Sequence, residues 1–127
     1  MFDNVNWNEL INNVLIYVKK WNYLIIKADI SKSSYSTKFY YSKEDKTFLD
    51  LYSTIDGKDR RDMFNSILPN LKKISEQFKT KDERLFFTVK VESNGNVKVI
   101  YRKLNNGNKL PDDEGINYLE LNKNDME

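Results

Sequence analysis

The stretch DERLFFTVKVESNGNVKVIYRK, residues 82–103, decides the fold of this chain. Two runs of alternating apolar side chains flank an Asn-Gly pair at residues 94–95, which is the pattern of a β-hairpin. A two-residue turn would pair Val91 with Lys98 and place lysine on the apolar side of the hairpin. A three-residue loop with a left-handed glycine brings the two apolar sets together instead. The predicted register pairs Val91 with Val97, Val89 with Val99, and Phe87 with Tyr101.

This register sends most basic side chains of the hairpin to the face opposite its apolar set. That outer face also receives aromatic side chains from the hairpin and from an earlier strand. Aromatic rings can stack on nucleic-acid bases while cations neutralise phosphates, and the same residue types anchor protein interfaces. The outer face could therefore bind either a nucleic acid or a protein. Its candidate binding residues are Tyr40, Phe86, Lys90, Lys98 and Arg102.

Two helices are predicted outside the hairpin, over residues 7–18 and 59–79. In the first, apolar side chains recur at the spacing of one helix face, and Asn6 with Glu9 forms a capping box at its start. In the second, Pro69 interrupts an apolar face that continues beyond it. We therefore predict either one kinked helix or two abutting helices in this region.

Short strands are predicted over residues 21–30, 37–41, 47–52 and 116–121, in addition to the two strands of the hairpin. The order of elements is helix, three strands, helix, then two or three strands. This order favours an α+β fold in which an antiparallel sheet of five or six strands has two helices on one face. We expect residues 1–121 to form a single domain and residues 122–127 to form a short polar tail.

The composition argues against catalysis by this chain. Its 127 residues contain no cysteine and no histidine, which removes thiolate chemistry, the commonest general base and the commonest transition-metal ligands. No Gly-rich phosphate loop or nucleophile motif occurs. We predict a protein that is not an enzyme, with no catalytic residues, no metal or other cofactor, and no small-molecule substrate. Its apolar runs are too short to span a bilayer, so we expect a cytoplasmic protein without a membrane partner.

The net charge of +2 is unevenly distributed along the chain. Residues 1–111 contain 20 basic and 13 acidic side chains, whereas residues 112–127 contain one basic and six acidic side chains. A short acidic segment beside a basic body can either fold back onto that body or face a basic partner.

Several strings of the sequence resemble the YezG/EsaG-like family of bacterial immunity proteins over residues 8–102. They are KKWNYLIIKADIS (19–31), KFYY (38–41), ISEQFK (74–79) and LFFTVKVESNGNVKVIYR (85–102). The resemblance implies a small cytosolic antitoxin that binds the nuclease domain of a secreted or contact-delivered toxin and blocks it. Its partner would therefore be a cognate protein toxin.

Neutralisation of this kind needs affinity and coverage, and no chemistry from the inhibitor. Because a nuclease must attract a polyanion, we expect the acidic segment to meet the toxin. An acidic toxin would instead meet the outer face. A nucleic-acid-binding module and a structural subunit of a larger assembly are the competing hypotheses. The predicted toxin-binding residues are Asp112, Asp113, Glu114, Tyr118 and Glu120.

Overall fold

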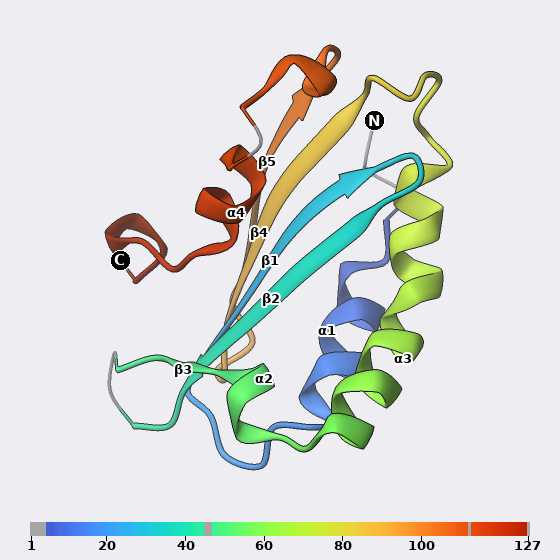
Figure 1. Cartoon of the computed structure of the whole chain (residues 1–127). Helices are drawn as coiled ribbons and strands as arrows, with labels where there is room; N and C mark the ends of the chain where they lie inside the picture. Colours follow the sequence, from blue (N-terminus) through green and yellow to red (C-terminus); the bar gives the residue numbers. More distant parts are fainter. Residues whose placement is uncertain (1–4, 45–46, 112, 127) are drawn as a thin grey trace.

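The computed structural model describes residues 5–44, 47–111 and 113–126 of an α+β protein (Figure 1). Its antiparallel sheet has five strands in the order β3-β2-β1-β4-β5. The strands are β1 (Tyr23–Ser31), β2 (Tyr35–Ser42), β3 (Leu49–Asp50), β4 (Arg84–Glu92) and β5 (Val97–Leu104). The helices are α1 (Trp7–Leu15), α2 (Leu51–Thr54), α3 (Gly57–Ser75) and α4 (Glu114–Leu119), with 3-10 turns η1 (Gly107–Lys109) and η2 (Lys123–Met126).

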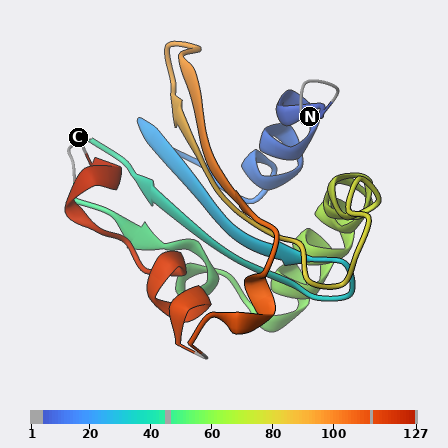
Figure 2. The ribbon, with the colours of Figure 1, turned by 90° about the horizontal axis from the view of Figure 1, so that it is seen from above.

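The main core lies between the sheet and the helices α1 and α3, which run side by side on one face (Figures 1 and 2). Helix side chains such as Leu10 and Ile67 meet Ile26 and Phe87 of the central strands, and all four are buried. Burial of each such side chain contributes about 1.5–3 kcal/mol to folding. The apolar periodicity of the sequence therefore identified this core correctly.

A side-chain cap marks the start of each of these two helices. The Oδ1 atom of Asn6 accepts a hydrogen bond from the Glu9 amide at 3.0 Å, which confirms Asn6 as the N-cap of α1. Helix α3 begins slightly earlier than expected, because Asp56 accepts from the Asp59 amide at 2.7 Å. Pro69 lies inside α3, and the helix continues past it to Ser75 as a single element.

The hairpin of β4 and β5 has the predicted register. Val91 lies opposite Val97, Val89 opposite Val99, and Phe87 opposite Tyr101. Gly95 has a φ of +101° in the connecting loop, a conformation that glycine adopts without the strain a Cβ atom would bring. Burial of the apolar side chains of β4 thus contributes more free energy than the difference between the two turn types, and it determines the register.

We expect Gly95→Ala to lower the free energy of unfolding by about 1–2 kcal/mol, because alanine at positive φ is strained even in open space. Gly57→Ala is the matched control, since this glycine starts α3 without positive φ and its added Cβ would meet its nearest atom at 3.9 Å. Urea denaturation measures both variants. Equal stability losses would show that the turn geometry is not the cause.

Two predicted strands are wrong. The strand expected over residues 47–52 is reduced to Leu49–Asp50, because the Asp50 side chain accepts from the Tyr52 amide at 3.0 Å and starts α2. The strand expected over residues 116–121 is replaced by the helix α4. Gly115, Tyr118 and Leu119 recur at helical spacing and face inward, so the alternation of apolar residues in this short segment misled the assignment.

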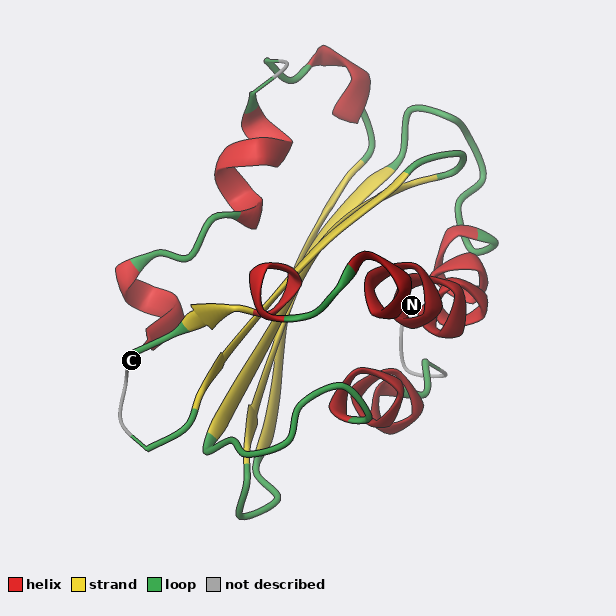
Figure 3. Cartoon of the chain, turned by 60° about the horizontal axis from the view of Figure 1, so that its bottom comes forward, coloured by secondary structure: helices red, strands yellow, loops and turns green. Residues whose placement is uncertain are grey.

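The C-terminal residues 113–126 cover much of the outer face of the sheet, so of the two alternatives for the acidic segment the structure shows folding back onto the body. Figures 2 and 3 show α4 and η2 on the side of the sheet opposite α1 and α3. Residues 122–126, predicted as part of a polar tail, also lie against the sheet, and Asp125 is buried there. None of the helices within the described ranges combines the length and apolar composition needed to cross a membrane.

Candidate functional site

The C-terminal segment, defined here as residues 113–126, is attached to the outer face through Tyr118. The Tyr118 ring stacks on Phe86 with a centroid distance of 4.8 Å and an interplanar angle of 17°. Its hydroxyl lies 2.7 Å from the Thr88 hydroxyl, and the Lys27 ammonium lies 4.7 Å from the ring centroid. One aromatic side chain thus combines stacking, a hydrogen bond and a cation–π contact.

Lys27 is the unexpected member of this interface, because its side chain is only 1% exposed. Its Nζ donates to Asp125 Oδ2 at 2.6 Å and to the Glu120 carbonyl at 3.1 Å. The carboxylate is itself held in place, since Asp125 Oδ2 also accepts from the Asn122 amide at 3.0 Å. A buried charge requires a partner of this kind, so the ion pair ties the C-terminal segment to the centre of β1.

A second ion pair fixes the other end of the segment. Arg84 donates from Nε and Nη2 to the two carboxylate oxygens of Asp29, at 2.7 and 2.6 Å. This bidentate hydrogen bonding raises the pKa of the Arg84 guanidinium. Gly115 of α4 lies directly against the pair, where an added Cβ would collide with both side chains. The Asp29–Arg84 pair therefore forms the polar surface against which α4 packs.

The structure places the two predicted binding sites against each other. Phe86 and Tyr40 are 1% and 8% exposed, and the Tyr40 hydroxyl donates to the Leu119 carbonyl at 2.8 Å. Neither ring is accessible for stacking with bases in this arrangement. Lys90 is half-buried, and its ammonium lies 3.4 Å from the Asn124 carbonyl. Lys98 and Arg102 are exposed on β5.

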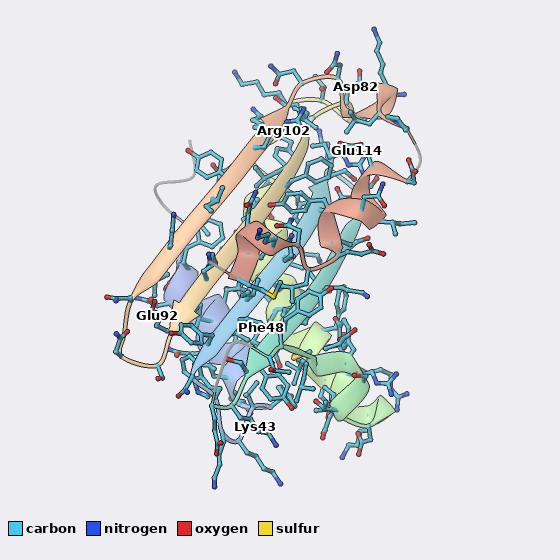
Figure 4. All side chains as sticks on the ribbon, turned by 90° about the vertical axis from the view of Figure 1, so that its left-hand side faces the viewer. Lys43, Phe48, Asp82, Glu92, Arg102 and Glu114 are labelled. Carbon is cyan, nitrogen blue, oxygen red and sulfur yellow. The ribbon has the colours of Figure 1, made fainter. Side chains whose placement is uncertain are left out.

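The predicted toxin-binding residues do not form one acidic patch. Asp112 lies outside the described residues. Asp113 is exposed before α4, and Glu120 is exposed beyond its end. Glu114, labelled in Figure 4, is half-buried in the first turn of α4. Six helical residues rise by about 9 Å, which separates Glu114 from Glu120. Tyr118 faces the sheet, so the acidic segment has largely folded back onto the body of the protein.

Tyr40, whose hydroxyl donates to the Leu119 carbonyl, makes the contact between the C-terminal segment and the sheet dependent on pH. Burial, together with the nearby carboxylates of Asp50 and Glu120, raises the pKa of Tyr40 to about 12 from 10.0. A raised folded-state pKa stabilises the protein fully below pH 10, and this stabilisation is lost as pH rises through 12. We expect the free energy of unfolding to fall between pH 10 and 12, with tyrosinate absorbance rising in parallel.

Tyr40→Phe tests the assignment, because it removes the titrating hydroxyl and keeps the ring. We expect a shallower decline over this pH range in the variant. Some decline will remain, since burial also raises the pKa of Tyr52 and Tyr118. An unchanged pH profile would show that Tyr40 does not contribute.

The two exposed outer-face candidates, Lys98 and Arg102, lie on β5, the last strand of the sheet. Five of its eight residues are exposed, whereas the neighbouring β4 is mostly buried. In Figure 4, the C-terminal segment lies in front of β1 and β4 and leaves β5 uncovered to one side. We call this surface the open edge; its exposed residues are Val97, Lys98, Ile100, Tyr101 and Arg102.

Apolar side chains are a prominent part of the open edge. Val97, Ile100 and Tyr101 are 43%, 48% and 51% exposed. Long edge strands with exposed apolar side chains tend to pair with other chains, and proteins often protect them with charged residues. Lys98 and Arg102 supply that charge here, so the open edge is cationic as well as apolar.

A cavity of about 300 Å³ adjoins the start of β5 on the outer face. Lys90, Lys98, Glu92 and Asp125 contribute charged groups to its wall, and Tyr23 and Phe48 contribute aromatic rings 6.4 Å apart. Figure 4 shows Phe48 and Glu92 at this end of the sheet. The cavity is a mixed aromatic and charged recess next to the open edge.

Sequence reasoning found Lys98 and Arg102 but missed the exposure of Val97 and Tyr101 on the open edge. Val97 and Tyr101 were assigned to the buried face, because they lie opposite Val91 and Phe87. Their exposure results from the position of β5 at the sheet margin, beyond the helices. An alternating pattern indicates which face a residue occupies, but it does not indicate how far the helices reach across that face.

Comparison with known proteins identifies neither a matching family model nor a matching curated relative. Within residues 5–44, 47–111 and 113–126, no three carboxylates come together in a geometry that would hold a metal ion. The geometry on which a function can be argued is therefore that of the open edge and its adjoining cavity.

Proposed function

We propose that this chain is an immunity protein, which binds a cognate bacterial toxin in the cytoplasm and neutralises it by obstruction. The observation that supports this proposal is the open edge, an eight-residue strand with exposed apolar, aromatic and cationic side chains. Such a surface suits association with another protein. The resemblance of residues 8–102 to YezG/EsaG-like immunity proteins supports the same proposal.

The dimensions of the surface suit this role. Eight extended residues span about 27 Å, and the cavity widens the same region on the outer face. A standard interface buries about 800 Å² on each partner, which is enough to exclude a substrate from a cleft. The partner is most concretely a toxin domain of the nuclease class, which acts on a polymer and must present an open cleft.

The outer face gives less support to a nucleic-acid-binding module. Its two principal aromatic candidates, Phe86 and Tyr40, are covered by the C-terminal segment. Binding of single strands relies on accessible rings together with a cationic groove. The open edge retains only a few cations, so we place protein recognition first.

Co-expression with the product of the neighbouring upstream gene tests the proposed function. We expect that product to be toxic alone, to be tolerated in the presence of this chain, and to copurify with it in a stable complex. Persistent toxicity with no complex would refute the proposal. Binding to single-stranded oligonucleotides in a salt titration would favour the alternative module.

A further inference from the structure

We propose that the partner docks by adding an extended, acidic strand to the side of β5 that faces away from β4. The inference rests on the proposed function for the identity of the partner, but not for the chemistry of the surface. It assigns the recognition to backbone hydrogen bonds along the open edge together with charge pairing at Lys98 and Arg102. The pattern required of the added strand can be derived from the hairpin geometry.

The phase of the backbone indicates which groups of β5 point away from β4. The Glu92 amide donates to the Asn96 carbonyl at 2.8 Å, so this pair is a hydrogen-bonded pair of the antiparallel ladder. Hydrogen-bonded and non-hydrogen-bonded pairs alternate along such a ladder. Residues 98, 100 and 102 therefore direct their amides toward β4, whereas residues 97, 99, 101 and 103 direct theirs away from β4.

The side chains define the preferred partner sequence. Lys98, Ile100 and Arg102 share the outer face of β5, and Lys98 lies opposite Lys90 of β4. Cross-strand neighbours have Cβ atoms about 4.5–5.5 Å apart, so acidic residues on an added strand would pair directly with the two β5 cations. The matching pattern is acidic, apolar and acidic at alternate positions, with the apolar residue opposite Ile100.

A second copy of this chain fits less well. In the register that pairs Ile100 with itself, Lys98 lies opposite Arg102 of the other copy at two symmetric positions, where like charges repel. Moving the register by two residues in either direction places Ile100 opposite a cation instead and removes the apolar pair. Charge complementarity therefore favours an acidic partner over self-association.

The test uses a ten-residue threonine peptide with a central Glu-Thr-Val-Thr-Glu, and a control peptide with lysine in place of both glutamates. Each is titrated to millimolar concentration into isotope-labelled protein, followed by amide shifts and hydrogen exchange. We expect the acidic peptide to bind at least tenfold more tightly than the lysine peptide. It should slow exchange at residues 97, 99 and 103, with little change at 98, 100 and 102.

Charge reversal at the open edge provides the matched variants. We expect Lys98→Glu with Arg102→Glu to reverse the preference between the two peptides. The control, Lys58→Glu with Arg61→Glu, makes the same change in charge at exposed positions of α3 and should keep the acidic preference. Equal binding of both peptides, no effect at β5, or an equal loss in the control variant would overturn the inference. So would concentration-dependent protection of β5 without peptide, which would identify a homodimer.

The toxin complex separates this inference from the proposed function. If the upstream product forms the complex and protects the outward amides of β5, both are supported. If it forms a complex protected elsewhere, the docking mode is wrong and the function stands. If no complex forms, the proposed function fails, and the peptide experiment decides the inference by itself.

Discussion

Asp125→Asn is expected to destabilise the protein by about 3 kcal/mol, the order of loss when one partner of a buried ion pair is removed. The reason is that Lys27 is 1% exposed and would lose the carboxylate 2.6 Å from its ammonium. The loss has an upper limit, because detachment of the C-terminal segment would return Lys27 to water. Urea denaturation and hydrogen exchange across residues 113–126 measure the two effects.

Two companion variants make this experiment specific. Glu120→Gln removes an exposed charge from the same segment, and we expect it to change stability by less than about 0.5 kcal/mol. Lys27→Met combined with Asp125→Asn removes both charges, and it should recover much of the lost stability because no unpaired ion remains buried. If Asp125→Asn and Glu120→Gln are equally stable, the ion pair does not hold the segment.

Gly115→Ala is expected to cost about 1–3 kcal/mol, the range found when extra atoms are forced into a packed site. The new methyl group would overlap Asp29 and Arg84, whose bidentate pair leaves it no room. We expect faster amide exchange throughout α4 and a lower midpoint of urea denaturation.

Gly57→Ala again provides the control, because the added methyl at that position meets only ordinary contacts. If Gly115→Ala matches the stability of the wild type, α4 can shift away from the ion pair without loss. The Asp29–Arg84 pair would then not determine the position of the C-terminal segment.

The sequence predicted the helix-bearing half of the fold well. The hairpin register followed from the need to bury Val89 and Phe87 on one side, a requirement worth several kcal/mol and much larger than differences between turns. The capping residue Asn6 likewise located α1, because a hydrogen bond to a local amide needs no knowledge of the tertiary structure. Both features could be predicted because they depend on residues close in sequence or on a strong alternation of apolar and polar side chains.

The candidate site was harder to predict, because it depends on contacts between distant residues. Lys27 and Asp125 are 98 positions apart, and each one alone resembles an ordinary solvated charge. The same limit applies to Tyr118, whose short helical segment contains too few residues for its period to be recognised. The exposure of Val97 and Tyr101 depends on the order of strands in the sheet, which local patterns did not reveal.

The 98-residue separation of Lys27 and Asp125 also has a consequence for biosynthesis. Ribosomes add about 5–20 residues per second, so Asp125 emerges about 5–20 s after Lys27. Once β4 and β5 have also emerged, the sheet can fold against α1 while its opposite side stays hydrated. The last layer can therefore assemble only after Asp125 has emerged, and chaperones have seconds in which to engage the uncovered rings.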